Sequence, residues 1–382
     1  MSTPAAMTPL TVVVAPDSFK GSLSAAEAAA AMAEGARAVF GPDAVIVQCP
    51  MADGGEGTLD AVLAVWGVPA RTLSTVDALG RPRQARVGIS SDGRTAVIEA
   101  AEANGLPDVS DVELEPLRAD SFGVGILAHD LLDQGVDEIL LCVGGSASTD
   151  GGTGLLSALG VAFLDHAGQV VPPGGAGLGA IRAIDVSGLH ERARRVRWRL
   201  AVDVSNPLCG EQGAASVFGP QKGASAADVH VLDAGLAHLC AVVERATGLS
   251  MLDRPGAGAA GGMPATLVPL LGAEMMPGST MVADAVGLAD RLAGADLVLT
   301  GEGRFDSQSL AGKVVDAVTR LSPTAARVIV IAGSVGLSSD QTRAAGLTAA
   351  FSIANGPASL AELQRNAFDR VRDVTAQVCA IL

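Results

Sequence analysis

Three short segments of the sequence place acidic side chains among glycines, and each follows a run of residues that is expected to form a strand. They cover residues 16–22, 52–58 and 300–306. Ligands of open parallel sheets bind at the edge where the strands end, so we expect these carboxylates to lie together. Glycines and acids also form ordinary turns and helix caps. Three such segments at one sheet edge nevertheless favour a small-molecule site.

The middle of the chain holds further glycine-rich segments. Residues 144–154 follow an expected strand at 138–143, and the amides and hydroxyls of such a loop can surround phosphate oxygens at a helix start. Residues 203–208 follow a second expected strand at 197–202, and Lys222 lies in a glycine-containing turn. These segments add amide donors and an ammonium group to the carboxylates of the chain ends.

This inventory suits phosphoryl transfer. In that reaction the protein mainly positions two reactants, cations and amides offset phosphate charge, and a carboxylate accepts the hydroxyl proton. The five histidines lie outside the glycine motifs and the chain has no tyrosine, so covalent acyl chemistry has little support. Lys313 does not complete a P-loop, because a valine follows it, and the glycine pairs at 55/57 and 301/303 meet an aspartate where a dinucleotide-binding fingerprint needs its third glycine. A standard P-loop kinase or dehydrogenase built on these loops is therefore disfavoured.

The composition narrows the class of protein. The chain has 382 residues, of which 49% are hydrophobic, and this predicts two or three soluble domains. Its net charge of −15 argues against a protein that coats a phosphate backbone, so we expect no nucleic-acid partner. Five scattered cysteines without a C-x-x-C pair are typical of small buried residues in a reducing compartment.

Two segments bear on localisation. The first ten residues lack the basic start and apolar run of a secretory signal. The uncharged stretch at residues 255–273 holds three prolines and five glycines, which predicts a surface or ligand-facing loop in place of a membrane span. We therefore expect a cytoplasmic protein without a membrane partner.

Lysine is rare in this chain. Of 26 basic residues only three are lysines, namely Lys20, Lys222 and Lys313, and each lies in a different glycine-rich segment. An arginine bias across the chain makes the remaining lysines candidates for positions that need a compact ammonium group.

The elements that would position these residues alternate at both chain ends. Capping-box residues, Ser24 with Glu27 and Ser359 with Glu362, indicate helix starts. Alternation of strands and helices is typical of a parallel sheet covered on both faces. We expect strands at residues 11–15, 44–49, 296–300, 327–331 and 347–353, and helices at 24–39, 59–66, 313–320, from 338 and from 359.

Between these ends the pattern changes, because residues 83–100 alternate like antiparallel strands. We therefore predict an α/β fold with two domains. A Rossmann-like, doubly wound parallel-sheet domain is built from both chain ends, residues 10–80 and 286–382, and a mixed α/β domain is inserted at residues 81–285. Residues 1–9 are expected to form a flexible tail.

Six motifs occur in order along the chain. They are APDSFKGSL at residues 15–23, ADGGEGT at 52–58, GGSASTDGG at 144–152, DVSNPL at 203–208, VFGPQKGA at 217–224 and TGEGRFDSQSLAGK at 300–313. In content and order they resemble the type I bacterial glycerate kinases, from about Thr11 to the C-terminus. The resemblance implies ATP-dependent phosphorylation of D-glycerate with Mg²⁺, with 2-phosphoglycerate as the favoured product. It also implies two α/β domains, one inserted in the other.

The resemblance suggests a role for each motif residue as a hypothesis. The candidate catalytic residues are Lys20, Asp53 and Asp203, with one of the two aspartates as base or metal ligand. The candidate glycerate-binding residues are Asp17, Ser18, Gly54, Gly55, Glu56, Thr58 and Asn206. The candidate ATP-binding residues are Gly144, Gly145, Ser146, Ser148, Thr149, Asp150, Gly151, Lys222 and Lys313, although Lys313 could instead only pair with a neighbouring acid. Glu302 and Asp306 are the candidate Mg²⁺ residues, acting largely through bound waters.

Two other functions stay open at this point. One is a kinase for a related small hydroxy acid, such as tartronate or a sugar acid. The other is a non-catalytic module that binds a small molecule on the same scaffold, since a fold does not by itself determine a function. The expected partners in all cases are small molecules, and we make no prediction of the oligomeric state.

Overall fold

The computed structural model describes residues 9–382, so most of the tail predicted at residues 1–9 lies outside the described residues. The chain divides into two compact units. The first contains the described residues up to Asp53 together with Asp60–Trp66 and Ser279–Leu382, and the second contains Gly54–Leu59 and Gly67–Gly278. The expected α/β fold with parallel sheets is confirmed.

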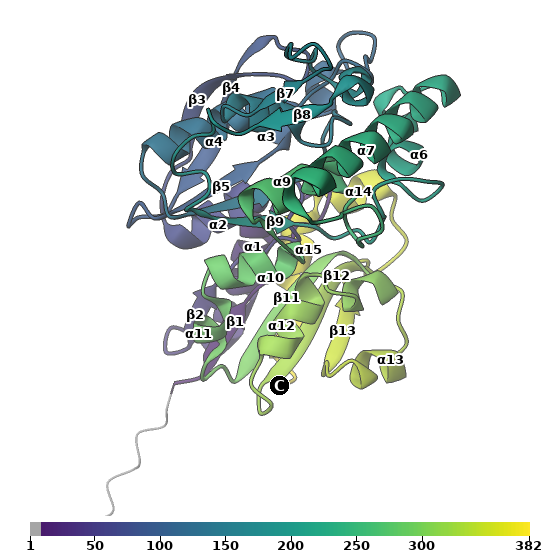
Figure 1. Cartoon of the computed structure of the whole chain (residues 1–382). Helices are drawn as coiled ribbons and strands as arrows, with labels where there is room; N and C mark the ends of the chain where they lie inside the picture. The colour runs from purple at the N-terminus through teal and green to yellow at the C-terminus, as the bar shows by residue number, and fades with distance from the viewer. Residues whose placement is uncertain (1–8) are drawn as a thin grey trace, which may run out of the picture. The chain divides into compact units, whose positions relative to one another are not determined.

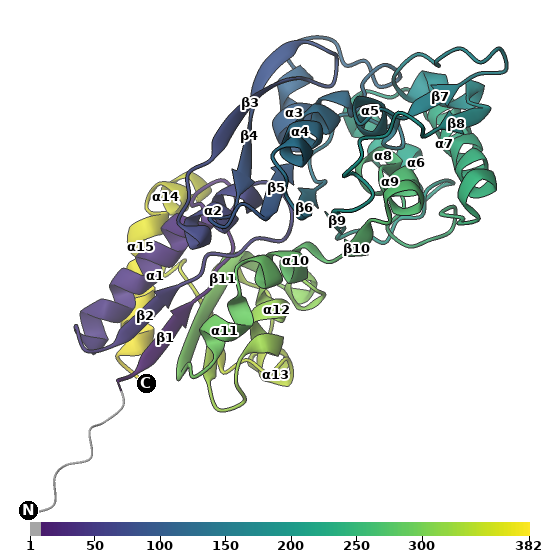
Figure 2. The same ribbon diagram turned by 60° about the vertical axis from the view of Figure 1, so that its left-hand side comes forward.

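The first unit is built on a five-stranded sheet with the order β13-β12-β11-β1-β2, in which every neighbouring pair is parallel (Figure 1). Its strands are β1 (Thr11–Val14), β2 (Val45–Gln48), β11 (Leu297–Phe305), β12 (Arg327–Val335) and β13 (Ala349–Ser352). Its helices are α1 (Ala25–Phe40), α2 (Thr58–Trp66), α10 (Gly278–Ala285), α11 (Leu288–Leu292), α12 (Val314–Leu321), α13 (Ser339–Ala344), α14 (Leu360–Arg365) and α15 (Ala367–Cys379). Helices α1 and α15 pack together over one face of the sheet, and α12 packs against β11 (Figure 2).

The second unit is built on a six-stranded mixed sheet with the order β10-β9-β6-β5-β4-β3, in which β3, β4 and β5 are joined by antiparallel pairing. Its strands are β3 (Arg71–Val76), β4 (Pro82–Ile89), β5 (Thr95–Glu99), β6 (Glu138–Cys142), β9 (Arg197–Ala201) and β10 (Glu274–Met276), with β7 (Ala162–Leu164) and β8 (Ala183–Asp185) as a separate pair. Its helices are α3 (Ala101–Asn104), α4 (Phe122–Asp133), α5 (Thr153–Ala158), α6 (Ala214–Phe218), α7 (Ala226–Thr247), α8 (Ala259–Gly262) and α9 (Pro264–Leu271).

Several elements differ from the sequence predictions. Strand β11 continues to Phe305, so the acidic motif expected after the strand lies partly within it. The uncharged stretch predicted as a loop contains the buried helix α9, whose first residue, Pro264, needs no amide partner. The boundary expected between residues 80 and 81 lies at Gly67 in this division, because β3 pairs with β4.

Helix α7 is the one described helix that is long and apolar enough to cross a membrane by length and composition. Its apolar side packs in the core of the second unit through Leu236, Leu239 and Val243. Of its most apolar 18-residue window 39% is buried, and core helices of soluble proteins pass the same test of length and composition.

Each unit contains one of the two tryptophans of the chain. The indole Nε1 of Trp66, at the end of α2, donates a hydrogen bond to the Ala285 carbonyl oxygen at 2.8 Å. The Nε1 of the buried Trp198, in β9, donates to the Ala193 carbonyl oxygen at 2.7 Å. Both indoles are therefore anchored within their own unit.

Candidate functional site

Three adjacent strands of the first unit bring three carboxylates to one sheet edge. Asp17 follows β1, Asp53 follows β2, and Glu302 lies in β11. The backbone ladder extends past the ends of β1, because the Asp17 amide donates to the Gly301 carbonyl oxygen at 2.8 Å and the Met51 amide donates to the Pro16 carbonyl oxygen at 2.9 Å. The expectation that these acidic motifs meet at one edge is thus met for these residues of the first unit.

Burial and neighbouring charges at this edge disfavour the ionised forms of Asp17 and Glu302. Burial, the charge of Asp53 and the charge of Glu302 raise the pKa of Asp17 to about 7, although the Ser18 amide donates to its Oδ1 at 2.6 Å. Burial likewise raises the pKa of Glu302, and its buried Oε1 has no hydrogen-bond partner. We refer to Asp17, Asp53 and Glu302 as the carboxylate cluster. It holds more negative charge than its protein surroundings offset, so it favours a proton or a cation.

Lys313 supplies the positive charge beside the cluster. Its Nζ lies 3.8 Å from Asp53 Oδ2. The charge of Lys313 opposes the rise in the pKa of Asp17 and of Glu302, and both pKa values remain raised. Lys313 occupies the N-cap position of α12, and the hydroxyl of Ser279 donates to the carbonyl oxygen of the preceding Gly312 at 2.5 Å. Lys313 therefore forms an ion pair with a neighbouring acid, which was one of the two roles considered for it from the sequence.

Lys20 and Ser18 lie in the tight loop after β1. Phe19 and Leu23 exchange backbone hydrogen bonds of 2.9 and 3.0 Å across this loop, and Gly21 has a φ of 78°, which favours glycine. Lys20 is exposed at its tip, with no ion-pair or hydrogen-bond partner among the described residues. Its ammonium group is available to an anionic ligand.

Asp306 has partners of its own. Its Oδ1 accepts the Gln308 amide at 2.9 Å, and its Oδ2 lies 3.0 Å from Arg304 Nε. It caps the short 3-10 helix η4 (Ser307–Leu310). Both oxygens are thus engaged, and its role at a metal stays a prediction.

In the second unit, the loop Gly54–Thr58 lies against Asp203. A Cβ added to Gly54 would lie 2.6 Å from Ala201 Cβ and 3.3 Å from Asp203 Oδ2, so glycine permits this approach. Asp203 Oδ1 accepts the Gly278 amide at 2.9 Å, and the Thr58 hydroxyl donates to the Gly55 carbonyl oxygen at 2.8 Å.

Two candidate residues of these motifs remain, Glu56 and Asn206. Glu56 is exposed, whereas Asn206 uses its side-chain amide to donate to the Gln212 carbonyl oxygen at 2.8 Å. The backbone oxygen of Asn206 also accepts the amides of Gly256 and Gly258. Asn206 therefore holds its own loop in shape.

The glycine-rich loop after β6 turns most of its side chains inward. Gly144 and Gly145 are exposed, whereas Ser146, Ser148, Thr149, Asp150 and Gly151 are all buried. Asp150 holds the loop from inside, because its Oδ2 accepts the amide and hydroxyl of Ser121 at 2.9 and 2.7 Å and the amide of Gly154 at 3.0 Å. The structure thereby gives Asp150 a positioning role, and its direct contact with a nucleotide stays a prediction.

Lys222 lies beneath the same loop. It is 3% exposed, and its Nζ donates to the Ser148 carbonyl oxygen at 2.5 Å and the Ser146 hydroxyl at 3.2 Å. Burial lowers the pKa of this ammonium group to about 8, against the opposing effect of Asp150. Lys222 thus braces the loop.

Two buried polar residues of this region, Glu99 and Asn104, lie outside the six sequence motifs. Glu99 ends β5, is buried, and accepts the Leu59 amide at 2.6 Å. Asn104 is fully buried and donates to the Ser148 hydroxyl at 2.8 Å, while its Oδ1 is unpartnered, as is the buried Thr149 Oγ1. An acid closing an apolar strand was the one available signal for Glu99.

A further glycine pattern has a packing role. Gly256, Gly258 and Gly261 have G-x-G-x-x-G spacing, but they follow a turn instead of a strand. A Cβ at Gly261 would lie 2.3 Å from the Ser148 carbonyl oxygen. Gly261 thus lets the backbone pack against the buried side of the 144–154 loop, whereas Gly256 and Gly258 approach the segment at residues 202–207. The three glycines therefore serve packing and do not form a dinucleotide-binding fingerprint.

Comparisons with known proteins agree with one another. Residues 12–382 match the model of the glycerate kinase family. The chain is 42% identical to the glycerate 2-kinase of Escherichia coli (strain K12) over 97% of each chain, and 41% identical to the glycerate kinase of Bacillus subtilis (strain 168) over 96% of this chain and 97% of that one. A crystal structure of a "putative glycerate kinase 2" from Salmonella typhimurium LT2 matches with a TM-score of 0.89 and 40% identity, covering 98% of each chain.

Proposed function

The chain belongs to the glycerate kinase family and is a phosphotransferase with an alcohol acceptor, and from this premise we propose that it transfers the terminal phosphoryl group of ATP to D-glycerate in the cytoplasm. The observation that carries the proposal is the carboxylate cluster with Lys313 beside it. A cluster that favours a proton or a cation suits a reaction in which a hydroxyl loses a proton and phosphate charge is neutralised. The 2-hydroxyl group as acceptor rests on the name of the Escherichia coli relative.

The cluster fits Mg²⁺. Glu302 offers a buried carboxylate oxygen without a hydrogen-bond partner, and Mg²⁺ prefers carboxylate oxygens and water. When bound, Mg²⁺ would neutralise charge on the phosphates of the donor. We assign Glu302 to hold it and Asp306 to support this position by capping the adjoining helix η4.

We assign proton transfer to Asp17. Its pKa of about 7 leaves a large ionised fraction at neutral pH together with an appreciable affinity for a proton, as a general base requires. Its carboxylate would accept the hydroxyl proton of glycerate while that oxygen bonds to the γ-phosphorus and the bond from this phosphorus to the β-γ bridging oxygen breaks, which leaves ADP. Asp53 keeps the pKa of Asp17 high and pairs with Lys313.

The remaining residues would bind the two substrates. The exposed ammonium group of Lys20, with Ser18 next to Asp17, suits the glycerate carboxylate. In the second unit, the exposed amides of Gly144 and Gly145 suit phosphate oxygens, and Lys222 adds positive charge below the loop. Asp203 would orient the loop that contains Gly54.

An ADP-release assay across a panel of hydroxy acids tests this function. With ATP and Mg²⁺ we expect D-glycerate to give the highest kcat/KM, with tartronate and sugar acids well below it. Phosphorus NMR of the product is expected to show 2-phosphoglycerate. Higher turnover of another acid would reassign the substrate, and calorimetric binding of glycerate without ADP release would refute a kinase function.

A further inference from the structure

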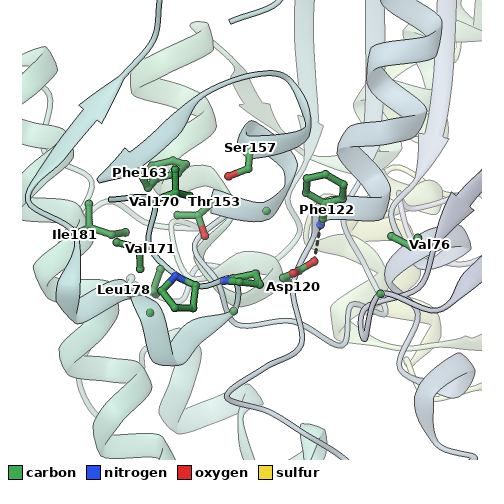
Figure 3. A pocket seen from close by; sticks show the side chains of 16 residues that line it. Val76, Asp120, Phe122, Thr153, Ser157, Phe163, Val170, Val171, Leu178 and Ile181 are labelled. Atoms are coloured by element: carbon green, nitrogen blue, oxygen red, sulfur yellow. Dashed lines mark hydrogen bonds between the residues drawn. The ribbon is translucent and has the colours of Figure 1, made fainter. Parts of the chain in front are cut away.

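A cavity of about 350 Å³ opens in the second unit, where the glycine-rich loop at residues 144–154 ends and α5 begins (Figure 3). Its walls come from the start of α4, from α5, from β7 and from the segment after β7. The apolar lining includes Phe122, Phe163, Val171, Leu178 and Ile181. This volume lies within the usual range for small-ligand pockets, which are mainly apolar with a few convergent polar groups.

Polar groups line one part of this cavity. Asp120, Thr153 and Ser157 contribute side chains to it, and Figure 3 shows them around the same space as the Phe122 ring. Asp120 Oδ1 accepts the Phe122 amide at 2.8 Å, which leaves the second carboxylate oxygen for a ligand. Burial and the charge of Asp150 raise the pKa of Asp120 to about 6. The Ser157 hydroxyl makes no hydrogen bond with the described part of the chain.

The cavity and the glycine-rich loop share one frame. Asp150 binds the amide and hydroxyl of Ser121, which stands between Asp120 and Phe122 in the cavity wall. The same carboxylate binds the amide of Gly154, which also lines the cavity. The C-terminal end of the loop that we assign to phosphates, Thr153 and Gly154, therefore forms part of the cavity wall.

We propose that this cavity binds the purine base of the phosphoryl donor. A purine has two flat apolar faces and a polar edge, which match the apolar lining and the polar groups at one end. Phe122 is 38% exposed and offers a ring for stacking, and the Asp120 carboxyl group can accept a hydrogen bond from an exocyclic amino group. The inference rests on the proposed function, because it takes residues 144–154 as the phosphate-binding loop.

Calorimetric titration with ADP and with pyrophosphate separates the base from the phosphates. Wild type is expected to bind ADP more tightly than pyrophosphate. Ser157→Phe places a ring in the cavity from a half-buried position on α5, so it should weaken ADP binding by about tenfold or more and leave pyrophosphate binding unchanged. Ser187→Phe makes the same change in an exposed turn outside the cavity and should bind both ligands like wild type.

Phe122→Ala serves as the second variant, because it removes a partly exposed ring without filling the cavity. It should also weaken ADP binding by about tenfold through lost stacking, with pyrophosphate binding unchanged. Equal ADP affinity in wild type and Phe122→Ala would overturn the proposal, as would a wild type that binds pyrophosphate as tightly as ADP. These titrations measure binding and need no catalysis. A failure to phosphorylate glycerate would therefore refute the proposed function without changing what the titrations say about the cavity.

Discussion

Replacing Asp17 by asparagine is expected to make the folded protein more stable at pH 8 while removing most of its activity. Burial at the sheet edge, together with the charges of Asp53 and Glu302, raises the pKa of Asp17 to about 7 from its ordinary value of 3.8. Asparagine keeps an oxygen that can accept the Ser18 amide, but it carries no charge. The variant therefore removes a repulsion that the wild type retains.

The magnitude follows from proton linkage. Between pH 3.8 and 7 the folded state keeps the proton of Asp17 while the unfolded state has lost it, so the free energy of unfolding falls as the pH rises. Each pKa unit corresponds to about 1.4 kcal/mol, so a shift of about three units costs the wild type about 4 kcal/mol above pH 7. At pH 5 the cost is less than half of this, because the unfolded state has lost its proton over only about one pH unit. The advantage of Asp17→Asn should therefore grow by about 2–3 kcal/mol from pH 5 to pH 8.

Urea unfolding followed by circular dichroism, in EDTA at pH 5 and pH 8, measures this difference. Asp43→Asn is the matched control, because Asp43 lies exposed in the turn between α1 and β2. An advantage of Asp17→Asn that is the same at both pH values would refute the account of Asp17. Full activity of the variant would remove Asp17 as the general base.

Three further predictions concern charge, the glycine-rich loop and the sheet. Lys313→Met should move the acidic limb of the kcat/KM profile to higher pH, because the lysine lowers the pKa of Asp17; an unmoved limb contradicts this, and Lys313→Arg should restore it. Asp150→Asn should cost about 3 kcal/mol in thermal unfolding, because several buried donors lose a charged acceptor; an unchanged Tm would contradict this. Gly301→Ala should abolish soluble expression, because its Cβ would lie 1.8 Å from a carbonyl oxygen of β12, whereas Gly356→Ala meets nothing within 4 Å and should express normally.

Local signals predicted the elements of the first unit well. The box of Ser24 and Glu27 is present at the start of α1, and that of Ser359 and Glu362 at the start of α14. These signals depend on residues three positions apart, so the sequence contains them in full. The end of β11 predicted at residue 300 was wrong, because Gly301 and Gly303 have low strand propensity. Pairing with β12, which the local sequence does not reveal, keeps these residues in the sheet.

The sequence predicted which residues lie at the candidate site better than it predicted what each residue does there. The sheet-edge rule placed Asp17, Asp53 and Glu302 together, but the pKa of Asp17 depends on the other two strands and could not be predicted from its own motif. The inward orientation of Asp150 and Lys222 was also not predictable. An exposed phosphate loop and an internally braced one share the same glycines and hydroxyls, and only packing distinguishes them.

The two anchored indoles give this protein a spectroscopic property. Because the chain has no tyrosine, Trp66 and Trp198 account for essentially all of its near-ultraviolet emission, even on excitation at wavelengths that tyrosine would share. Each lies in a different unit. A Trp198→Phe variant would therefore report the unit with the carboxylate cluster alone, and a Trp66→Phe variant the unit with the glycine-rich loop. Glycerate and nucleotide titrations could then be followed separately in each unit, without any added label.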